Sequence, residues 1–214
     1  MQLYSFFNSS ASYRVRIALA LKGLPYTYRA VNIRAGEHRD LAYLTEINAA
    51  AGVPALVTDE GESLGQSLAI IDYLDARFPE PLLIPADPRQ RARVLEFSAL
   101  IACDIHPVNN MRVLKYLQDT LGVTAAEKDE WYRHWIAEGL EAAERLLDRY
   151  GIGPFCFGAT PTLADCCLIP QVANAERVGC AFEPYPRIME VCAHARADSA
   201  FAAAAPNRQP DFVG

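Results

Sequence analysis

The chain has 214 residues, of which 51% are hydrophobic and 21% are charged, and its formal net charge at pH 7 is −6. A chain of this length buries a full core, either as one large domain or as two small ones. The negative charge argues against a nucleic-acid partner, which usually requires a basic face, and no apolar run approaches the roughly 18 residues of a membrane helix. We therefore expect neither a nucleic acid nor a membrane as a partner.

The cysteine pattern and the amino terminus bear on the compartment in which the protein works. The sequence has no C-x-x-C pair and no zinc-ligand spacing, and most of its cysteines stand among apolar neighbours. They are Cys103, Cys156, Cys166, Cys167, Cys180 and Cys192. We expect reduced core thiols and no metal site. The amino terminus enters a strand pattern at once and shows no signal peptide, so we expect a cytoplasmic protein.

The first third of the chain alternates strand and helix patterns. Strands are expected at residues 2–6, 26–31, 55–58 and 63–64, and helices at residues 12–22, 40–47 and 67–78. Gly23 and Pro25 follow the first helix as stop signals, and residues 59–62 have the composition of a hairpin turn. This order predicts a small mixed sheet with helices packed on it.

Clustered prolines interrupt these patterns between residues 79 and 88. Such a cluster resists both helix and strand, so we place a linker at residues 80–87. The linker divides the chain into an α/β domain at residues 1–79 and an all-helical domain at residues 88–214.

The second domain is expected to be helical throughout. A long periodic stretch at residues 89–121 contains Pro107, which predicts a kink near His106. Further helices are expected at residues 124–150 and 162–180, followed by shorter ones up to residue 205. Thr162 and Asp165 have the spacing of a capping box at the start of the third helix.

The junction between the first strand and the first helix is the most informative stretch. The strand ends in a run of small hydroxyl residues, Ser9, Ser10 and Ser12, which opens directly onto the helix. Such a junction points backbone N–H groups and the positive end of the helix dipole at one spot, where an anion is stabilised. Arg14 and Arg16 add positive charge. A thiol held there has a lowered pKa and becomes a nucleophile; the alternative is that one serine is only an N-cap.

Two further openings in the first domain have features of ligand sites. Val53-Pro54 leads into a strand, and a cis proline there would turn the Val53 backbone outward toward an extended peptide; an ordinary strand-entry proline is the alternative. Gln66 and Ser67 begin a helix whose first-turn N–H groups would bind a carboxylate; a serine cap is the alternative. Glutathione is a short peptide with a thiol and two carboxylates, so its binding requires a thiol site, a clamp on its backbone and a carboxylate site.

The chain resembles the zeta class of glutathione transferases, the family that contains maleylacetoacetate isomerase, from end to end. The motifs that carry the resemblance are Ser9–Leu19, Val53-Pro54, Gln66–Ile71, Cys103–Asn110, Thr162–Asp165, Pro170–Arg177 and Asn207–Asp211. Each is weak alone, but the serine-rich opening and Pro170–Arg177 are specific together. The resemblance implies the glutathione transferase fold and a homodimer. The N-terminal domain would be thioredoxin-like, with Ser9 and Ser12 where redox relatives carry C-x-x-C, and the C-terminal helical domain would bind substrate.

The resemblance also implies roles for individual residues. Ser9 and Ser10 would face the sulfur of glutathione as the catalytic residues. Arg177 would hold a carboxylate of a small dicarboxylate substrate, for which the arginine fork is well shaped; a salt bridge on the helix surface or between the domains is the alternative. His106 would come from the kinked helix over the site, or would be a structural histidine that satisfies carbonyls freed by the kink.

The first domain would supply most of the contacts to glutathione. Gln66 and Ser67 would bind its γ-glutamyl end. Val53 would bind the cysteinyl backbone, and His38 would reach the glycine carboxylate. The full set of implied cofactor-binding residues is Ser9, Ser10, Ala11, Ser12, Tyr13, Arg14, His38, Val53, Gln66, Ser67, His106, Asn110, Met111 and Arg112.

The activity implied by the resemblance is glutathione-dependent cis–trans isomerisation of maleylacetoacetate to fumarylacetoacetate, in the breakdown of tyrosine and phenylalanine. Thiolate addition turns the cis double bond into a single bond that rotates, and expulsion of the thiolate leaves the trans product, so glutathione is not consumed. The alternatives are isomerisation of maleylpyruvate, glutathione transfer to small α-halo acids, and a binding module that keeps the fold without the chemistry.

Three departures from the family pattern bear on these expectations. Ala11 stands where the family usually has cysteine or threonine, so one polar group near the sulfur is missing. Some relatives that act on maleylpyruvate carry arginine at the positions of Asn8 and Met111, which disfavours that substrate here. The loop at residues 49–52 lacks the usual glutamine, which predicts weaker glutathione binding.

Overall fold

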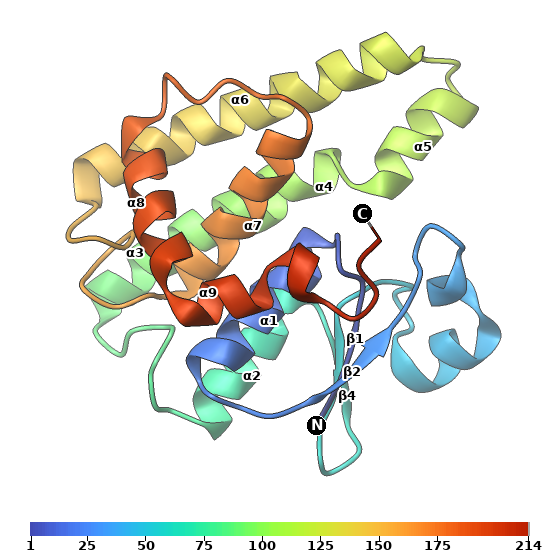
Figure 1. Cartoon of the computed structure of the whole chain (residues 1–214), viewed down its shortest axis with the longest axis horizontal. Coiled ribbons are helices and arrows are strands. Elements are labelled where there is room, and N and C mark those ends of the chain that lie inside the picture. The colour runs from blue at the N-terminus through green and yellow to red at the C-terminus, as the bar shows by residue number, and fades with distance from the viewer. Residues whose placement is uncertain (214) are drawn as a thin grey trace. The chain divides into compact units, whose positions relative to one another are not determined.

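The computed structural model describes residues 1–213. They form two compact units, and Figure 1 labels the helices and most of the strands. Unit 1 consists of Met1–Ile84 together with the C-terminal segment from Arg196, and unit 2 consists of Pro85–Ala195. The C-terminal segment therefore packs with the α/β unit, whereas the proline pattern assigns all of residues 88–214 to one helical domain.

Unit 1 is built on a mixed sheet of four strands. The strands are β1 (Gln2–Ser5), β2 (Thr27–Ala30), β3 (Ala55–Val57) and β4 (Ser63–Gly65), in the spatial order β2-β1-β3-β4. β1 pairs in parallel with β2 and antiparallel with β3, and β3 pairs antiparallel with β4. The predicted mixed sheet is confirmed, and β1, which leads to the serine run, lies in its interior with Leu3 fully buried.

Two of the helices of unit 1 begin shortly after a strand of the sheet: α1 (Ser10–Leu21) follows β1, and α2 (Ser67–Arg77) follows β4. A third is the short α9 (Ser199–Ala204). α9 lies beside α1, as the red and blue helices in Figure 1 show. The segment at residues 40–47, expected as a short helix, is a π-helical turn over Tyr43–Ile47.

A buried ion pair joins the end of α1 to α2, and hydrogen bonds of both its members bind the chain that follows α2. Lys22 Nζ lies 2.7 Å from Asp75 Oδ1, and both side chains are shielded from solvent. Lys22 also donates to the carbonyls of Phe78 at 2.8 Å and Pro81 at 2.7 Å. Asp75 accepts from the Ile84 N–H at 2.7 Å. Because both charges have several partners, the pair fixes the course of the chain where it leaves α2.

Unit 2 is helical, as its sequence pattern predicts. Its helices are α3 (Pro88–Ala99), α4 (His106–Val108), α5 (Met111–Asp119), α6 (Ala125–Tyr150), α7 (Leu163–Arg177) and α8 (Pro186–Ala197), of which the last runs past the end of the unit. The stretch at residues 89–121 is interrupted rather than only kinked. It passes through a π-helical segment at Leu100–Ile105, and Asn110 then caps α5 by accepting from the Arg112 N–H at 3.1 Å. Pro107 cannot supply the N–H that a continuous helix needs.

The start of α7 follows the predicted capping-box pattern. Thr162 donates from its N–H and Oγ1 to Asp165 Oδ2 at 2.8 and 3.0 Å, and the Cys156 N–H donates to Oδ1 at 2.9 Å. Asp165 is fully buried; burial raises the pKa of its carboxyl, while these hydrogen bonds lower it. The prediction is confirmed, and the network fixes the beginning of the helix that ends at Arg177.

Neither a membrane span nor a metal site is found among residues 1–213. No helix in this range is both long and apolar enough to cross a bilayer. The same residues hold no group of three or more His, Cys, Asp or Glu side chains placed to bind a metal ion. The six cysteines are free thiols, of which Cys103 is exposed.

Candidate active site

Ser9 ends the turn between β1 and α1 and is the N-cap of α1. Its N–H donates to the Phe6 carbonyl at 3.0 Å, and its Oγ accepts from the Ser12 N–H at 3.2 Å. The cap uses a lone pair of Oγ and leaves the hydroxyl proton free to donate to an anion. The two interpretations of this serine, N-cap and anion donor, are therefore compatible. Ser9 is half-buried, whereas Ser10 is buried.

Buried polar atoms of α1 lack hydrogen-bond partners among residues 1–213. They are Ser12 Oγ and the Nε and Nη2 atoms of Arg14. The remaining Arg14 nitrogen, Nη1, donates to Ser67 Oγ at 3.3 Å. A buried guanidinium with unpaired N–H groups is costly, and a carboxylate is the group that satisfies it best. Arg14, expected beside the start of α1, thus reaches the start of α2.

The start of α2 has the features of a carboxylate site. No side chain caps this helix, and its N-cap residue Gln66 is exposed with a φ of 65°. Non-glycine residues rarely adopt this conformation, and those that do cluster at functional sites. The first-turn N–H groups have no partner inside the helix. Ser67 Oγ accepts from Arg14 and keeps its own proton to donate. Backbone N–H groups, a hydroxyl and a guanidinium thus lie together, as carboxylate binding requires.

The loop before Val53 is anchored on both sides. The Gly52 carbonyl accepts from Tyr43 Oη at 2.7 Å and from Asn48 Nδ2 at 2.9 Å. On the other side, β3 begins at Ala55, and the intervening Val53–Pro54 bond is cis. Of the two interpretations of this proline, the cis form is therefore the one observed. The Val53 backbone is held in place, as a clamp on an extended peptide requires.

His38 is buried in a short 3-10 turn, and its Nδ1 has no partner within the described part of the chain. Burial lowers the pKa of the imidazole, and the neighbouring Arg39 lowers it further, against a smaller opposite effect of Asp40. His38 is therefore neutral at pH 7 and offers a ligand one N–H donor rather than a charge.

The lowered pKa of His38 predicts a loss of stability in acid. The folded state binds fewer protons at this site than the unfolded chain, so the free energy of unfolding falls as pH drops below about 6.5. His38→Gln is expected to reduce this fall, measured by urea unfolding at about pH 7.5 and about pH 5. His134→Gln, at an exposed position of α6, is the control and should keep the wild-type fall. Equal falls in both variants would contradict the assignment.

The predicted cofactor-binding residues of unit 2 gather around the break after α4. His106 begins α4, and Asn110 uses its Oδ1 to cap α5, which leaves its amide N–H groups for other partners. Met111 and Arg112 follow in the first turn of α5, and both are exposed. In unit 1, the predicted cofactor-binding residues other than His38 and Val53 lie around the starts of α1 and α2.

Arg177 is exposed and is the last residue of α7. Its Nη2 donates to Asn174 Oδ1 at 2.9 Å, and it also lies beside the Tyr132 hydroxyl. Burial raises the pKa of Tyr132, and the nearby guanidinium partly offsets this. No carboxylate of residues 1–213 forms an ion pair with Arg177, so its fork remains able to bind one.

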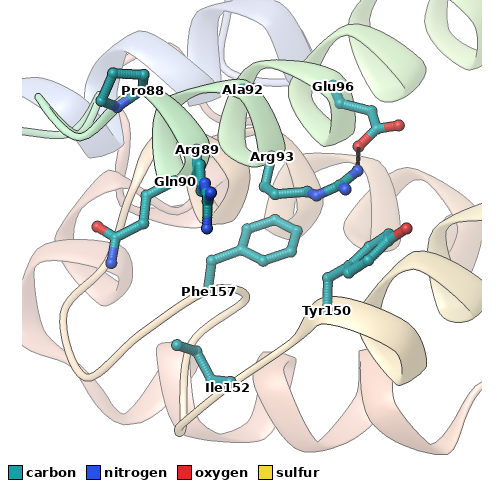
Figure 2. Close-up of a pocket in the computed structure, with 9 residues that line it drawn as sticks. All are labelled: Pro88, Arg89, Gln90, Ala92, Arg93, Glu96, Tyr150, Ile152 and Phe157. Carbon is teal, nitrogen blue, oxygen red and sulfur yellow. Dashed lines mark hydrogen bonds and ion pairs between the residues drawn. The ribbon is translucent and has the colours of Figure 1, made fainter.

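A cavity in unit 2 involves none of the predicted site residues (Figure 2). It has a volume of about 800 Å³ and is lined by α3, the end of α6 and the loop that follows α6. There the Arg93 guanidinium lies 3.7 Å from the centroid of the Tyr150 ring and pairs with Glu96 at 2.6 Å. Of the two arginines that line the cavity, Arg89 and Arg93, the second is thus already engaged.

Two residues that hold the Ser9 turn are absent from the predicted site. Asp211 Oδ2 accepts from the Phe7 N–H at 3.0 Å, and Arg16 Nη2 donates to the Phe7 carbonyl at 3.0 Å. From the sequence, Arg16 is expected only to add positive charge near the start of the first helix, and Asp211 is only the end of a tail motif. An arginine on the apolar face of α1 was the signal that could have found the first of them.

Comparison with known proteins gives matches along the whole chain. The models of the N-terminal and C-terminal domains of glutathione S-transferases match residues 3–82 and 129–194. Maleylacetoacetate isomerase from Pseudomonas aeruginosa is 48% identical over 213 residues, which cover 99% of this chain and 98% of that protein. A holo structure of maleylpyruvate isomerase, described as a bacterial zeta-class glutathione S-transferase, is 45% identical and covers 100% of both chains with a TM-score of 0.96.

Two structures of maleylacetoacetate isomerase from Anaeromyxobacter dehalogenans 2CP-1 also match. One has bound glutathione, and the other has dicarboxyethyl glutathione and citrate, in the active site. They are 43% and 42% identical, and each covers 98% of this chain and 96% of its own with a TM-score of 0.88. The chain therefore belongs to the glutathione S-transferase family, in the zeta class with the maleylacetoacetate isomerases.

Proposed function

We propose that this protein is a glutathione-dependent cis–trans isomerase that converts maleylacetoacetate to fumarylacetoacetate. The observation that carries the proposal is the position of Arg14, whose unpaired guanidinium atoms lie beside Ser67 at the uncapped start of α2. Arg14, which reaches this carboxylate site, lies on α1, the helix that Ser9 caps. The relative from Pseudomonas aeruginosa, which is 48% identical, supports maleylacetoacetate as the substrate.

Glutathione fits the unpartnered groups of unit 1. Its γ-glutamyl carboxylate matches Arg14, Ser67 and the first N–H groups of α2. Its cysteinyl backbone matches Val53, and its glycine carboxylate matches the N–H of a neutral His38. The active-site ligands of the Anaeromyxobacter dehalogenans structures, glutathione and dicarboxyethyl glutathione, support this assignment.

The chain contributes to the reaction mainly by electrostatics. When bound, glutathione supplies a thiol whose reversible addition to a conjugated cis alkene lets the former double bond rotate. The N–H groups at the start of α1 and the helix dipole stabilise negative charge beside Ser9, and the Ser9 hydroxyl donates its free proton to the same charge. A free cysteine thiol has a pKa of about 8.5, so lowering it by about one or two units ionises most of it at neutral pH.

Arg177→Ala is expected to raise the KM for the substrate about tenfold or more, with a smaller change in kcat. The guanidinium is held by Asn174 and has a fork that suits a carboxylate, and hydrogen bonds to charged groups contribute about 1.5–3 kcal/mol. Initial-rate kinetics at saturating glutathione measure the effect. Arg145→Ala, on the surface of α6, is the control. An unchanged KM in Arg177→Ala removes this residue from the site.

Isomerisation of maleylpyruvate is the second candidate function. The zeta-class maleylpyruvate isomerase with a TM-score of 0.96 favours it, whereas Asn8 and Met111, which replace arginines of some such enzymes, count against it. Values of kcat/KM for the two acids, measured on one preparation, decide between them. We expect the higher value for maleylacetoacetate; a higher value for maleylpyruvate would reassign the substrate.

We further infer a cytoplasmic homodimer that acts in the breakdown of tyrosine and phenylalanine. This inference rests on the family to which the chain belongs. Sedimentation tests the oligomeric state, with an expected mass of about twice the 23.6 kDa of the chain. A species of the single-chain mass would contradict the dimer.

A further inference from the structure

The turn that carries Ser9 is bound on both sides by residues distant in sequence. The Phe7 N–H donates to Asp211 Oδ2 at 3.0 Å, and the Phe7 carbonyl accepts from Arg16 Nη2 at 3.0 Å. Both backbone polar groups of Phe7, two positions before Ser9, therefore bind charged side chains. Such charge-assisted hydrogen bonds are about twice as strong as neutral ones.

Asp211 is itself fixed by the sheet. Its Oδ1 accepts from Tyr28 Oη on β2 at 2.6 Å, and the neighbouring Phe212 ring packs edge-on against Phe7 with centroids 5.5 Å apart. Burial, together with the bond to Asp211, raises the pKa of the Tyr28 hydroxyl, so Tyr28 remains a donor at neutral pH. The two oxygens of the Asp211 carboxylate therefore connect Tyr28 on β2 to Phe7 in the turn before α1.

Arg16 joins the same turn to α9. Its Nε donates to the Ala204 carbonyl at 2.9 Å, and its Nη1 donates to Ser5 Oγ at 3.2 Å and to the Phe6 carbonyl at 3.4 Å. The Phe6 carbonyl is the group that accepts from the Ser9 N–H and closes the turn. Arg16 is buried, and its guanidinium stays charged in this setting. The turn before α1 is thus held by two opposite charges.

We propose that Asp211 is a positioning residue for the isomerisation, which sets the Ser9 hydroxyl and the first N–H groups of α1 against the glutathione sulfur by holding Phe7. The inference rests on the proposed function, because it assumes that Ser9 faces the sulfur. When the Phe7 peptide moves, the cap residue Ser9, which lies two positions later in the chain, moves with it. A displacement of about 1 Å at a reacting centre costs on the order of a hundredfold in rate.

Asp211→Ala tests the proposal with three readouts. In the protein without ligand, hydrogen exchange of peptides covering residues 6–12 is expected to accelerate about tenfold. In the binary complex, ultraviolet titration is expected to show the glutathione thiol pKa raised by about one unit, a tenfold change in the ionisation equilibrium. The kcat should fall about ten- to a hundredfold with a smaller change in KM. Asp211→Asn keeps an acceptor for the Phe7 N–H and should recover most of each loss.

Gln209→Ala is the matched control for loosening of the C-terminal segment. Gln209 Nε2 donates to the carbonyls of Ala203 at 3.1 Å and Ala205 at 2.9 Å, at the end of α9, so its side-chain hydrogen bonds go to α9 and not to the turn. It should therefore leave the thiol pKa at the wild-type value. Tyr28→Phe removes one partner of the carboxylate and should change the thiol pKa in the direction of Asp211→Ala by a smaller amount. Because Tyr28→Phe is the milder change, it provides the test of the proposal if Asp211→Ala does not fold.

A wild-type thiol pKa in Asp211→Ala, or a shift of equal size in Gln209→Ala, would overturn the positioning role. In Tyr28→Phe, an unchanged thiol pKa together with unchanged exchange in residues 6–12 would do the same. The wild-type protein separates this failure from failure of the proposed function. If it binds no glutathione, or binds it without lowering the thiol pKa, the proposed function fails and the role of Asp211 fails with it.

Discussion

Ser9→Ala is expected to lower the rate of isomerisation by roughly ten- to a thousandfold, the range for one lost electrostatic donor at a developing charge. Ser9 Oγ accepts from the Ser12 N–H and has a proton to donate, and alanine removes both groups. The N–H groups at the start of α1 remain, so activity is reduced rather than abolished. The measurement is kcat at saturating glutathione and substrate.

The cap made by Ser9 must be separated from its role toward the sulfur. Alanine at an N-cap costs about 0.5–2 kcal/mol of stability, whereas glycine costs only a few tenths. Ser9→Gly should therefore lose as much rate as Ser9→Ala while it unfolds at a higher denaturant concentration. Ser9→Thr keeps the hydroxyl and should retain most activity. Wild-type turnover in both the alanine and glycine variants would show that Ser9 is only a cap and that Ser10 or the backbone activates the sulfur.

Asp75→Ala is expected to reduce the free energy of unfolding by about 3–5 kcal/mol, because it leaves the buried Lys22 ammonium without its carboxylate. The N–H groups of Leu83 and Ile84 lose their acceptor as well. Domains are typically stable by only about 5–15 kcal/mol, so this variant should be marginal. Urea unfolding at neutral pH measures the change.

A double variant shows whether the loss comes from the unpaired charge. Lys22→Met combined with Asp75→Leu removes both charges and should recover the part of the lost stability that comes from the unpaired ammonium, since apolar replacement of a buried pair is often neutral. The Leu83 and Ile84 N–H groups stay without their acceptor in both variants. The exposed pair of Arg145 and Glu141 on α6 is the control, and Glu141→Ala should cost less than about 1 kcal/mol. An equally small cost in Asp75→Ala would mean that the two carbonyl partners alone satisfy Lys22.

The sheet and the helix starts that form the candidate site of unit 1 were predictable because each depends on a local pattern. The first helix begins at Ser10 rather than at residue 12, since Ser9 is the cap. The sequence could not make that choice, because each of the three hydroxyl residues in the run is a good N-cap. The Thr162 capping box, by contrast, has a spacing that allows only one start.

The rest of the site depends on contacts between residues far apart in the chain. Arg14 and Ser67 are 53 positions apart, and Phe7 and Asp211 are 204 positions apart. No periodicity within either segment encodes such a pairing. The alanine-rich sequence around α9 likewise has no feature that assigns it to unit 1, and its place follows from packing on α1 and from the Arg16 bond to Ala204.

The use of glutathione as an unconsumed catalyst is tested by following maleylacetoacetate and total thiol together. The purified protein is assayed with and without a small amount of glutathione. We expect turnover that requires glutathione and leaves the total thiol unchanged while many equivalents of substrate react. Loss of thiol in step with substrate would contradict isomerisation and indicate a conjugating transferase, and the absence of both turnover and glutathione binding would indicate a fold without the chemistry.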